Sequence, residues 1–176
     1  MDIIQNSISA CATTVRLEIN EDSVNNMLTM MIRDNGKGMS QEMLEIATDP
    51  FFTSRTTRRV GLGLPLLKQN AERAGGYFSI TSAEGSGTTV SAGFVLNNID
   101  RPVLGDVAGV IVLTATAHTA IHFSYMHCKN GKSYTFDTVE VCTALGGIPL
   151  NEPLVYRPVC NLIEENLQDI GVEFNA

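Results

Sequence analysis

The apolar residues near the start of the chain recur at helical spacing. Ile4, Ile8 and Cys11 lie four and three residues apart, which predicts a helix over residues 2–11 with one apolar stripe. The pattern then alternates between strand-like and helix-like segments. It predicts strands over residues 14–19 and 27–33, a helix from Ser40 to about Thr48, a helix from Leu64 to about Ala74, and strands over residues 77–82 and 88–96.

The pattern changes after a linker-like segment, residues 97–106. The β-branched run that follows is compatible with a strand or with a helix capped by Asp106, and we favour the helix. Beyond it, Asn130 and Gly131 form a pair typical of a type I′ hairpin turn. Two further helices are predicted over residues 138–145 and 153–168.

This change predicts two parts. The first is a domain over residues 1–99, and the second is a small α+β extension over residues 100–176. The extension matches no motif with a chemical meaning. We expect it to pack on the sheet of the first part or to bind a partner.

Composition narrows the class of protein. The chain has 176 residues, of which 44% are hydrophobic, so it can bury a core. Its net charge of −7 argues against nucleic acid as the main partner, because nucleic-acid binders usually present a basic face. The four cysteines show no C-x-x-C spacing and no apolar run is long enough to span a membrane, which predicts a cytoplasmic protein without a membrane partner.

One stretch departs from this acidic background. "TSRTTRR" carries Arg55, Arg58 and Arg59 and precedes "GLGLPLLK", where a helix begins after glycines. Helix N-termini with free N–H groups bind phosphate, and arginine adds bidentate donors. The stretch therefore predicts either a lid that closes over a bound anion or a solvated basic loop before an ordinary helix.

Two common phosphate motifs are absent from the sequence. There is no G-x-x-x-x-G-K-[ST] stretch, which excludes a P-loop, and no G-x-G-x-x-G between a strand and a helix, which leaves a dinucleotide fold unsupported. A nucleotide site must therefore rest on a different arrangement.

Five short motifs provide that arrangement. In chain order they are "DIIQNSISA" (2–10), "DNGKGM" (34–39), "DPFFTS" (49–54), "GLGLPLLK" (61–68) and "GSGTTV" (85–90). Residues 1–96 thereby resemble the GHKL superfamily: gyrase, the large ATP-dependent heat-shock chaperone, sensor histidine kinases and mismatch-repair ATPases. The resemblance implies a Bergerat fold, an α/β two-layer sandwich whose mixed, mostly antiparallel sheet carries helices on one face. It also implies ATP and Mg²⁺ as ligands.

The resemblance also implies roles for single residues. Asn6 would offer its side-chain oxygen to Mg²⁺, a cation that prefers oxygen ligands. Asp34 would accept a hydrogen bond from the adenine amino group, and Thr88 would support Asp34 directly or through a water. Without the other motifs, these would be an ordinary helix-surface Asn, a turn-forming Asp and a strand Thr.

The glycine motifs would bring backbone close to the nucleotide. Gly36 and Gly38 would pass beside the adenine and ribose. Phe51 and Phe52 would anchor the lid. The residues implied around the phosphates are Gly61, Leu62, Gly63 and Leu64 at the helix start, with Arg55, Arg58 and Arg59 in the lid.

Asp2 marks a departure from the family pattern. Hydrolysing members normally have Glu four residues before the Asn, where it polarises the attacking water. The shorter Asp2 reaches less far, which predicts slow hydrolysis or a role limited to helping with Mg²⁺. The resemblance also leads us to expect structure ahead of this helix.

Three outputs stay open at this point. We favour a kinase-like transfer of phosphate to a protein partner, as in histidine kinases or anti-sigma-factor serine kinases. The alternatives are a slow gyrase-like ATPase with lid closure or dimerisation, and a regulatory module that binds nucleotide without turnover. His118, His122 and His127 could be phosphoacceptors or, with Cys128, metal ligands, but strand neighbours point to opposite faces, so we favour hairpin residues without chemistry.

Overall fold

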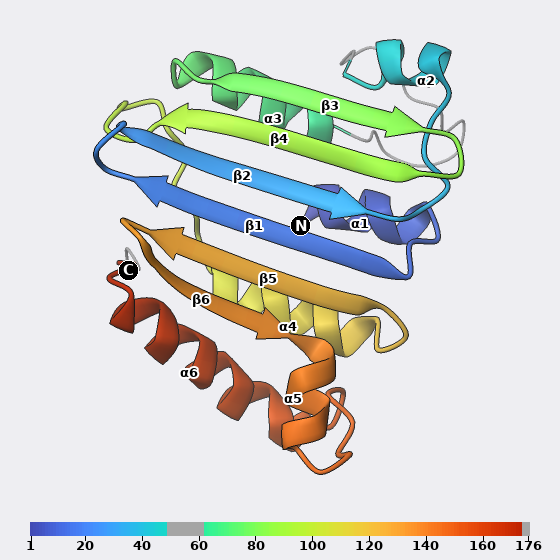
Figure 1. The fold of residues 1–176 in the computed structure, drawn as a ribbon, viewed down its shortest axis with the longest axis vertical. Helices are drawn as coiled ribbons and strands as arrows, with labels where there is room; N and C mark the ends of the chain where they lie inside the picture. The colour runs from blue at the N-terminus through green and yellow to red at the C-terminus, as the bar shows by residue number, and fades with distance from the viewer. Residues whose placement is uncertain (49–61, 174–176) are drawn as a thin grey trace.

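Six strands form one mixed sheet in the computed structural model, which describes residues 1–48 and 62–173 (Figure 1). The order across the sheet is β3-β4-β2-β1-β5-β6. Neighbouring strands are antiparallel except β1 and β5, which run parallel. The strands are β1 (Thr14–Asp22), β2 (Met27–Asp34), β3 (Tyr77–Ala83), β4 (Gly87–Val95), β5 (His122–Lys129) and β6 (Lys132–Asp137).

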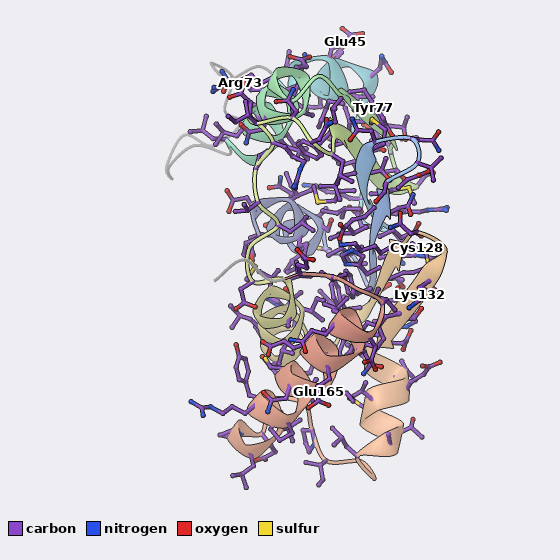
Figure 2. All side chains as sticks on the ribbon, turned by 90° about the vertical axis from the view of Figure 1, so that its left-hand side faces the viewer. Glu45, Arg73, Tyr77, Cys128, Lys132 and Glu165 are labelled. Atoms are coloured by element: carbon purple, nitrogen blue, oxygen red, sulfur yellow. The ribbon has the colours of Figure 1, made fainter. Side chains whose placement is uncertain are left out.

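Helices cover one face of this sheet. Figure 2 views the sheet from its side and shows α1, α3, α4 and α6 on the same side of it. The predicted α/β sandwich with helices on one face is confirmed. The helices are α1 (Asp2–Ser9), α2 (Gln41–Ile46), α3 (Gly63–Arg73), α4 (Val107–Ala117), α5 (Thr138–Ala144) and α6 (Pro153–Asp169).

Strand β1 shows how the sequence directs its side chains. Val15, Leu17 and Ile19 are buried at alternate positions, and the residues between them are more exposed. Period-two alternation places one face against the helices and leaves the other to water. In register, Val15 lies between Asp34 of β2 and Phe123 of β5.

The ambiguous run after residue 106 forms a helix, as favoured. The Asp106 side chain caps α4 by accepting a hydrogen bond from the Gly109 N–H at 2.7 Å. The turn predicted after β5 is also confirmed, because Asn130 and Gly131 have φ values of 50° and 85°, the positive values that a type I′ turn requires.

The C-terminal part continues the N-terminal sheet. β5 lies alongside β1, and its buried Phe123 and Tyr125 join the same hydrophobic core as Leu17 of β1. The expected packing on the sheet is thus edge-to-edge strand pairing, while the domain boundary after residue 99 stays a prediction. Within residues 1–48 and 62–173, no helix combines the length and the apolar character needed to cross a membrane.

Candidate functional site

Asp34 is a buried carboxylate at the end of β2. Only 8% of its surface is exposed. Its Oδ2 accepts a hydrogen bond from the Ser7 hydroxyl of α1 at 2.7 Å, and its Oδ1 accepts one from the Gly36 N–H at 2.8 Å. Among the described residues each oxygen therefore has one donor, and a carboxylate oxygen can accept more than one hydrogen bond.

Asn35, the next residue, fastens this end of β2 to the start of β1. Its Oδ1 accepts hydrogen bonds from the backbone N–H groups of Thr13 and Thr14 at 2.9 and 2.8 Å. Its Nδ2 donates to the Thr13 hydroxyl at 2.8 Å. These bonds hold the end of β2, where the loop after Asp34 begins, against the start of β1.

Glycines let the loops beside Asp34 pack backbone against backbone. A Cβ added to Gly38, whose φ is +65°, would lie 1.9 Å from the Ala83 carbonyl oxygen. A Cβ added to Gly87 would lie 1.9 Å from the Asp34 carbonyl oxygen. The Gly85 N–H donates to the Lys37 carbonyl at 2.8 Å, so the motifs "DNGKGM" (34–39) and "GSGTTV" (85–90) are joined to each other.

Thr88 lies directly across from Asp34 in the register of β4. Its hydroxyl oxygen is 2.9 Å from the Ser82 hydroxyl, which in turn donates to the Gly87 carbonyl at 2.8 Å. The direct hydrogen bond to Asp34 comes from Ser7 instead. A water-mediated contact between Thr88 and Asp34 stays a prediction.

The N-termini of α1 and α3 meet. A Cβ added to Gly63 would lie 2.8 Å from the Cβ of Asp2 and 3.3 Å from Ile3. Helix α3 begins after Leu62 without a side-chain cap, so none of the described side chains satisfies its first N–H groups. The structure thereby brings together Asp2 and the start of α3, with Asn6 exposed one turn further along α1.

Several predicted residues fall outside the described part of the chain. Their places around the phosphates and in the lid stay predictions. They are Phe51, Phe52, Arg55, Arg58, Arg59 and Gly61. Of the helix-start residues, Leu62 is exposed and Leu64 packs against the core.

The histidines lie in the C-terminal part. His127 is fully buried, whereas its neighbour Cys128 is half-buried, as expected for strand residues on opposite faces. His122 Nε2 lies 2.7 Å from the Asp137 carboxylate, whose other oxygen caps α5. In residues 1–48 and 62–173, no three His, Cys, Asp or Glu side chains are grouped to hold a metal ion.

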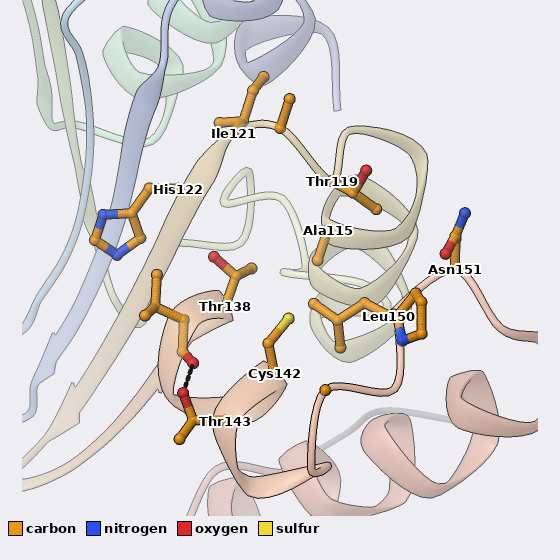
Figure 3. Close-up of a pocket in the computed structure, with 13 residues that line it drawn as sticks. Ala115, Thr119, Ile121, His122, Thr138, Cys142, Thr143, Leu150 and Asn151 are labelled. Carbon is orange, nitrogen blue, oxygen red and sulfur yellow. Dashed lines mark hydrogen bonds between the residues drawn. The ribbon is translucent and has the colours of Figure 1, made fainter.

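A cavity of about 720 Å³ lies elsewhere, between the end of α4, the start of β5, and α5. Among the residues that line it, His122 is the sole ionisable side chain besides the Cys142 thiol, and the His122 ring points away from Cys142 and Leu150 (Figure 3). His122 is also occupied by the Asp137 carboxylate, and the lining holds no lysine or arginine to meet a phosphate. The surroundings of Asp34 therefore remain the better candidate for a nucleotide.

Ser7 is the site residue that motif reasoning missed. It follows Asn6 in "QNSIS" and lies three residues after Ile4, on the edge of the apolar stripe. A hydroxyl on a buried helix face must find a partner inside the protein. That rule could have marked Ser7 as a buried donor, but not which acceptor it reaches.

Comparison with known proteins bears on this arrangement. A family model described as "Histidine kinase-, DNA gyrase B-, and HSP90-like ATPase" matches residues 1–98, which is more than half of the chain. The chain belongs to this family. Membership in the histidine kinase-, DNA gyrase B- and HSP90-like ATPases supports ATP binding by this chain.

The curated relatives of this chain are much longer proteins. A protein of Shewanella frigidimarina (strain NCIMB 400), described as a sensor protein, is 35% identical over 102 residues, or 57% of this chain and 16% of the relative. The non-motile and phage-resistance protein of Caulobacter vibrioides is 30% identical over 115 residues, or 60% of this chain and 14% of the relative. The chain thus spans less than a fifth of the length of these relatives.

A solved structure shares the fold. The N-terminal domain of a DNA repair protein superposes with a TM-score of 0.54 at 17% identity, over 76% of this chain and 49% of that one. The superposed part covers 76% of this chain, which is more than residues 1–98 alone could supply. The likeness in fold therefore includes residues beyond residue 98.

Proposed function

We propose that the protein binds Mg-ATP beside Asp34 and transfers the terminal phosphate to a protein partner. The observation that carries the binding proposal is the state of Asp34, a buried carboxylate held by two neutral donors. A buried charge without a compensating cation is costly, and a ligand amino group lowers that cost by donating to it. The adenine 6-amino group is such a donor.

Three further features of the described residues support the proposal for the rest of the nucleotide. Gly36 and Gly38 let the loop after Asp34 pack against Ala10 and Ala83, which sets its path beside the proposed base. The uncapped start of α3 at Gly63 offers N–H groups to phosphates. Asn6 is exposed on α1 and would offer an oxygen ligand to Mg²⁺, which neutralises phosphate charge when bound. Arg55, Arg58 and Arg59 would complete the site as donors from the lid.

Two observations support transfer to a protein partner. Relatives of the chain include proteins described as sensor kinases, and the acidic chain with one basic stretch suits a role in which ATP is held and passed on. Slow hydrolysis is the second candidate, because the Cβ of Asp2 lies against Gly63, beside the proposed phosphate site. Labelled phosphate on a partner would support the first, and free phosphate released by the protein alone would support the second.

Calorimetric titration with ATP tests the binding site. The wild type should bind ATP more tightly with Mg²⁺ than without it. Asp34→Asn should weaken binding roughly 10- to 100-fold, because a hydrogen bond to a charged group is replaced by one to a neutral amide. Asp169→Asn, the same change at an exposed position at the end of α6, is the matched control and should bind as the wild type does.

The titration has a clear contradictory result. If Asp34→Asn stays folded and binds ATP with unchanged affinity, Asp34 does not read the base. If the folded wild type binds no ATP, the binding proposal itself is wrong.

A further inference from the structure

Ser7 is a buried hydroxyl whose described partner is the Asp34 carboxylate. It is 3% exposed, lies in α1, and donates to Asp34 Oδ2 at 2.7 Å across 27 residues of sequence. The short distance and the charged acceptor place this bond among the stronger kinds of protein hydrogen bond. It joins α1, which carries the proposed Mg²⁺ ligand Asn6, to β2, which ends at Asp34.

The second hydrogen bond to Asp34 comes from a nearby residue of the same loop. By itself it leaves the Asp34 carboxylate free to rotate about its final torsion, and the bond from Ser7 stops that rotation. The Gly36 N–H, two residues further along the chain, donates to Oδ1 at 2.8 Å. The final torsion of an aspartate is broad, so one bond to one oxygen does not fix the plane of the carboxylate. Two donors on different oxygens, from different elements, fix it.

Helix α1 links both ends of the proposed nucleotide site. Successive helix residues point about 100° apart, so Asn6 faces solvent while Ser7 faces the core. The same turn of helix therefore presents an amide oxygen outward and fastens the carboxylate inward. Rigid support of this kind is what a recognition residue needs to discriminate between similar ligands.

We infer that Ser7 is a positioning residue for base recognition: its hydroxyl holds Asp34 in the orientation that accepts a hydrogen bond from a 6-amino purine. The inference rests on the proposed ATP site. Ser7 itself does not touch the nucleotide. Its contribution therefore depends on the 6-amino group of the ligand and not on the phosphates.

Two ligands separate positioning from general support. ATP carries the 6-amino group, and purine riboside triphosphate carries hydrogen in its place. Ser7→Ala should lower the affinity for ATP about tenfold. It should change the affinity for purine riboside triphosphate less than twofold, because the analogue has no 6-amino group to donate a hydrogen bond to Asp34. Ser9→Ala, the same change at an exposed position of α1, should alter neither affinity.

A second variant guards against loss of the fold. Ser7→Cys is nearly isosteric and replaces the hydroxyl by a weak donor, so it should also lose most of the discrimination while a thermal melt shows cooperative unfolding. Equal loss for both ligands would overturn the positioning role, and so would unchanged discrimination in either folded variant. If the wild type binds neither ligand, the ATP site and this inference both fail. If it binds both ligands equally, only base reading by Asp34 and Ser7 fails.

Discussion

Two buried carboxylates lie on neighbouring strands and have opposite kinds of partner. Asp34 at the end of β2 and Glu21 near the end of β1 are 8% and 9% exposed, and both face the helix-covered side of the sheet. Because β1 and β2 are antiparallel, the two carboxylates lie at opposite ends of the strand pair. Asp34 is held by a hydroxyl and an amide, and Glu21 by an imidazole and a cation.

Each oxygen of the Glu21 carboxylate has a partner within the protein. His127 Nε2 lies 2.9 Å from Glu21 Oε1, and Lys129 Nζ lies 3.2 Å from Oε2. The Tyr125 hydroxyl lies 2.6 Å from His127 Nδ1, so an imidazole with its proton on Nε2 satisfies both neighbours. The hydrogen bond from His127 lowers the pKa of the Glu21 carboxyl, and Lys129 adds to this effect against the opposing effect of burial.

The difference in partners is the basis for treating Glu21 as a structural carboxylate and Asp34 as the proposed ligand-binding carboxylate. Glu21 has its own cation and joins β1 to β5, so its charge is already compensated within the protein. The donors that reach Asp34 from the described residues carry no charge, and this is why we propose that it accepts a further hydrogen bond from a ligand. Burial alone would not have distinguished the two.

The largest expected effect contrasts the glycines in the turns beside the two carboxylates. Gly38 and Gly131 both have positive φ, but a Cβ at Gly38 would meet backbone at 1.9 Å, and a Cβ at Gly131 would meet nothing within 4 Å. Gly38→Ala should cost at least about 3 kcal/mol of unfolding free energy, and Gly131→Ala about 1 kcal/mol from left-handed strain alone. Urea unfolding measures both.

Equal costs for the two alanine variants would contradict this contrast. They would mean that the loop beside Asp34 can relax as freely as the β5–β6 turn.

A smaller effect is expected from neutralising Glu21. Glu21→Gln should lower the unfolding free energy by about 2 kcal/mol, because it leaves His127 and Lys129 without their anion. The affinity for ATP should stay within twofold of wild type, the reverse of the pattern expected for Asp34→Asn. Glu165→Gln, at an exposed position of α6, is the control and should change neither quantity.

Thermal melts and ATP titrations of the same preparations measure the Glu21→Gln effect. If Glu21→Gln lowers the ATP affinity as well as the stability, the proposed distinction between Glu21 and Asp34 is wrong.

The smallest effect is a dependence on pH. Because the folded-state pKa of Glu21 is lowered, its stabilisation is complete above the ordinary value of 4.5 and is lost as pH falls below 4.5 through the folded pKa. Below pH 4.5 the unfolding free energy of wild type should fall faster than that of Glu21→Gln, by no more than about 1.4 kcal/mol per pH unit. Parallel pH profiles from denaturant unfolding would contradict the role of the His127–Glu21 bond.

Local signals predicted most elements of the fold. Helix α3 and the β3–β4 hairpin followed from the period of their apolar residues, and the β5–β6 turn followed from Asn130–Gly131. Helix α4 was harder because it is buried on most sides and therefore has little periodicity. Its cap, Asp106, was the local signal that favoured the helix.

The candidate site was predictable only in part. The order of short motifs located Asp34, Gly36 and Gly38, because each motif is contiguous in sequence. The motif order did not predict the partners of the buried carboxylates, since Ser7 lies 27 residues from Asp34 and His127 lies 106 residues from Glu21. Both pairs exist only once strands and helices have packed.

The sequence by itself determined the elements, the glycine turns and the family, because periodicity, turn chemistry and motif order are properties of neighbouring residues. The tertiary structure decided that β5 pairs in parallel with β1 and that Ser7 rather than Thr88 bonds directly to Asp34. It also decided that Glu21 forms an ion pair with Lys129. The physical reason is range. A buried charge takes its partner from whichever elements the core brings beside it, and no local pattern records that choice.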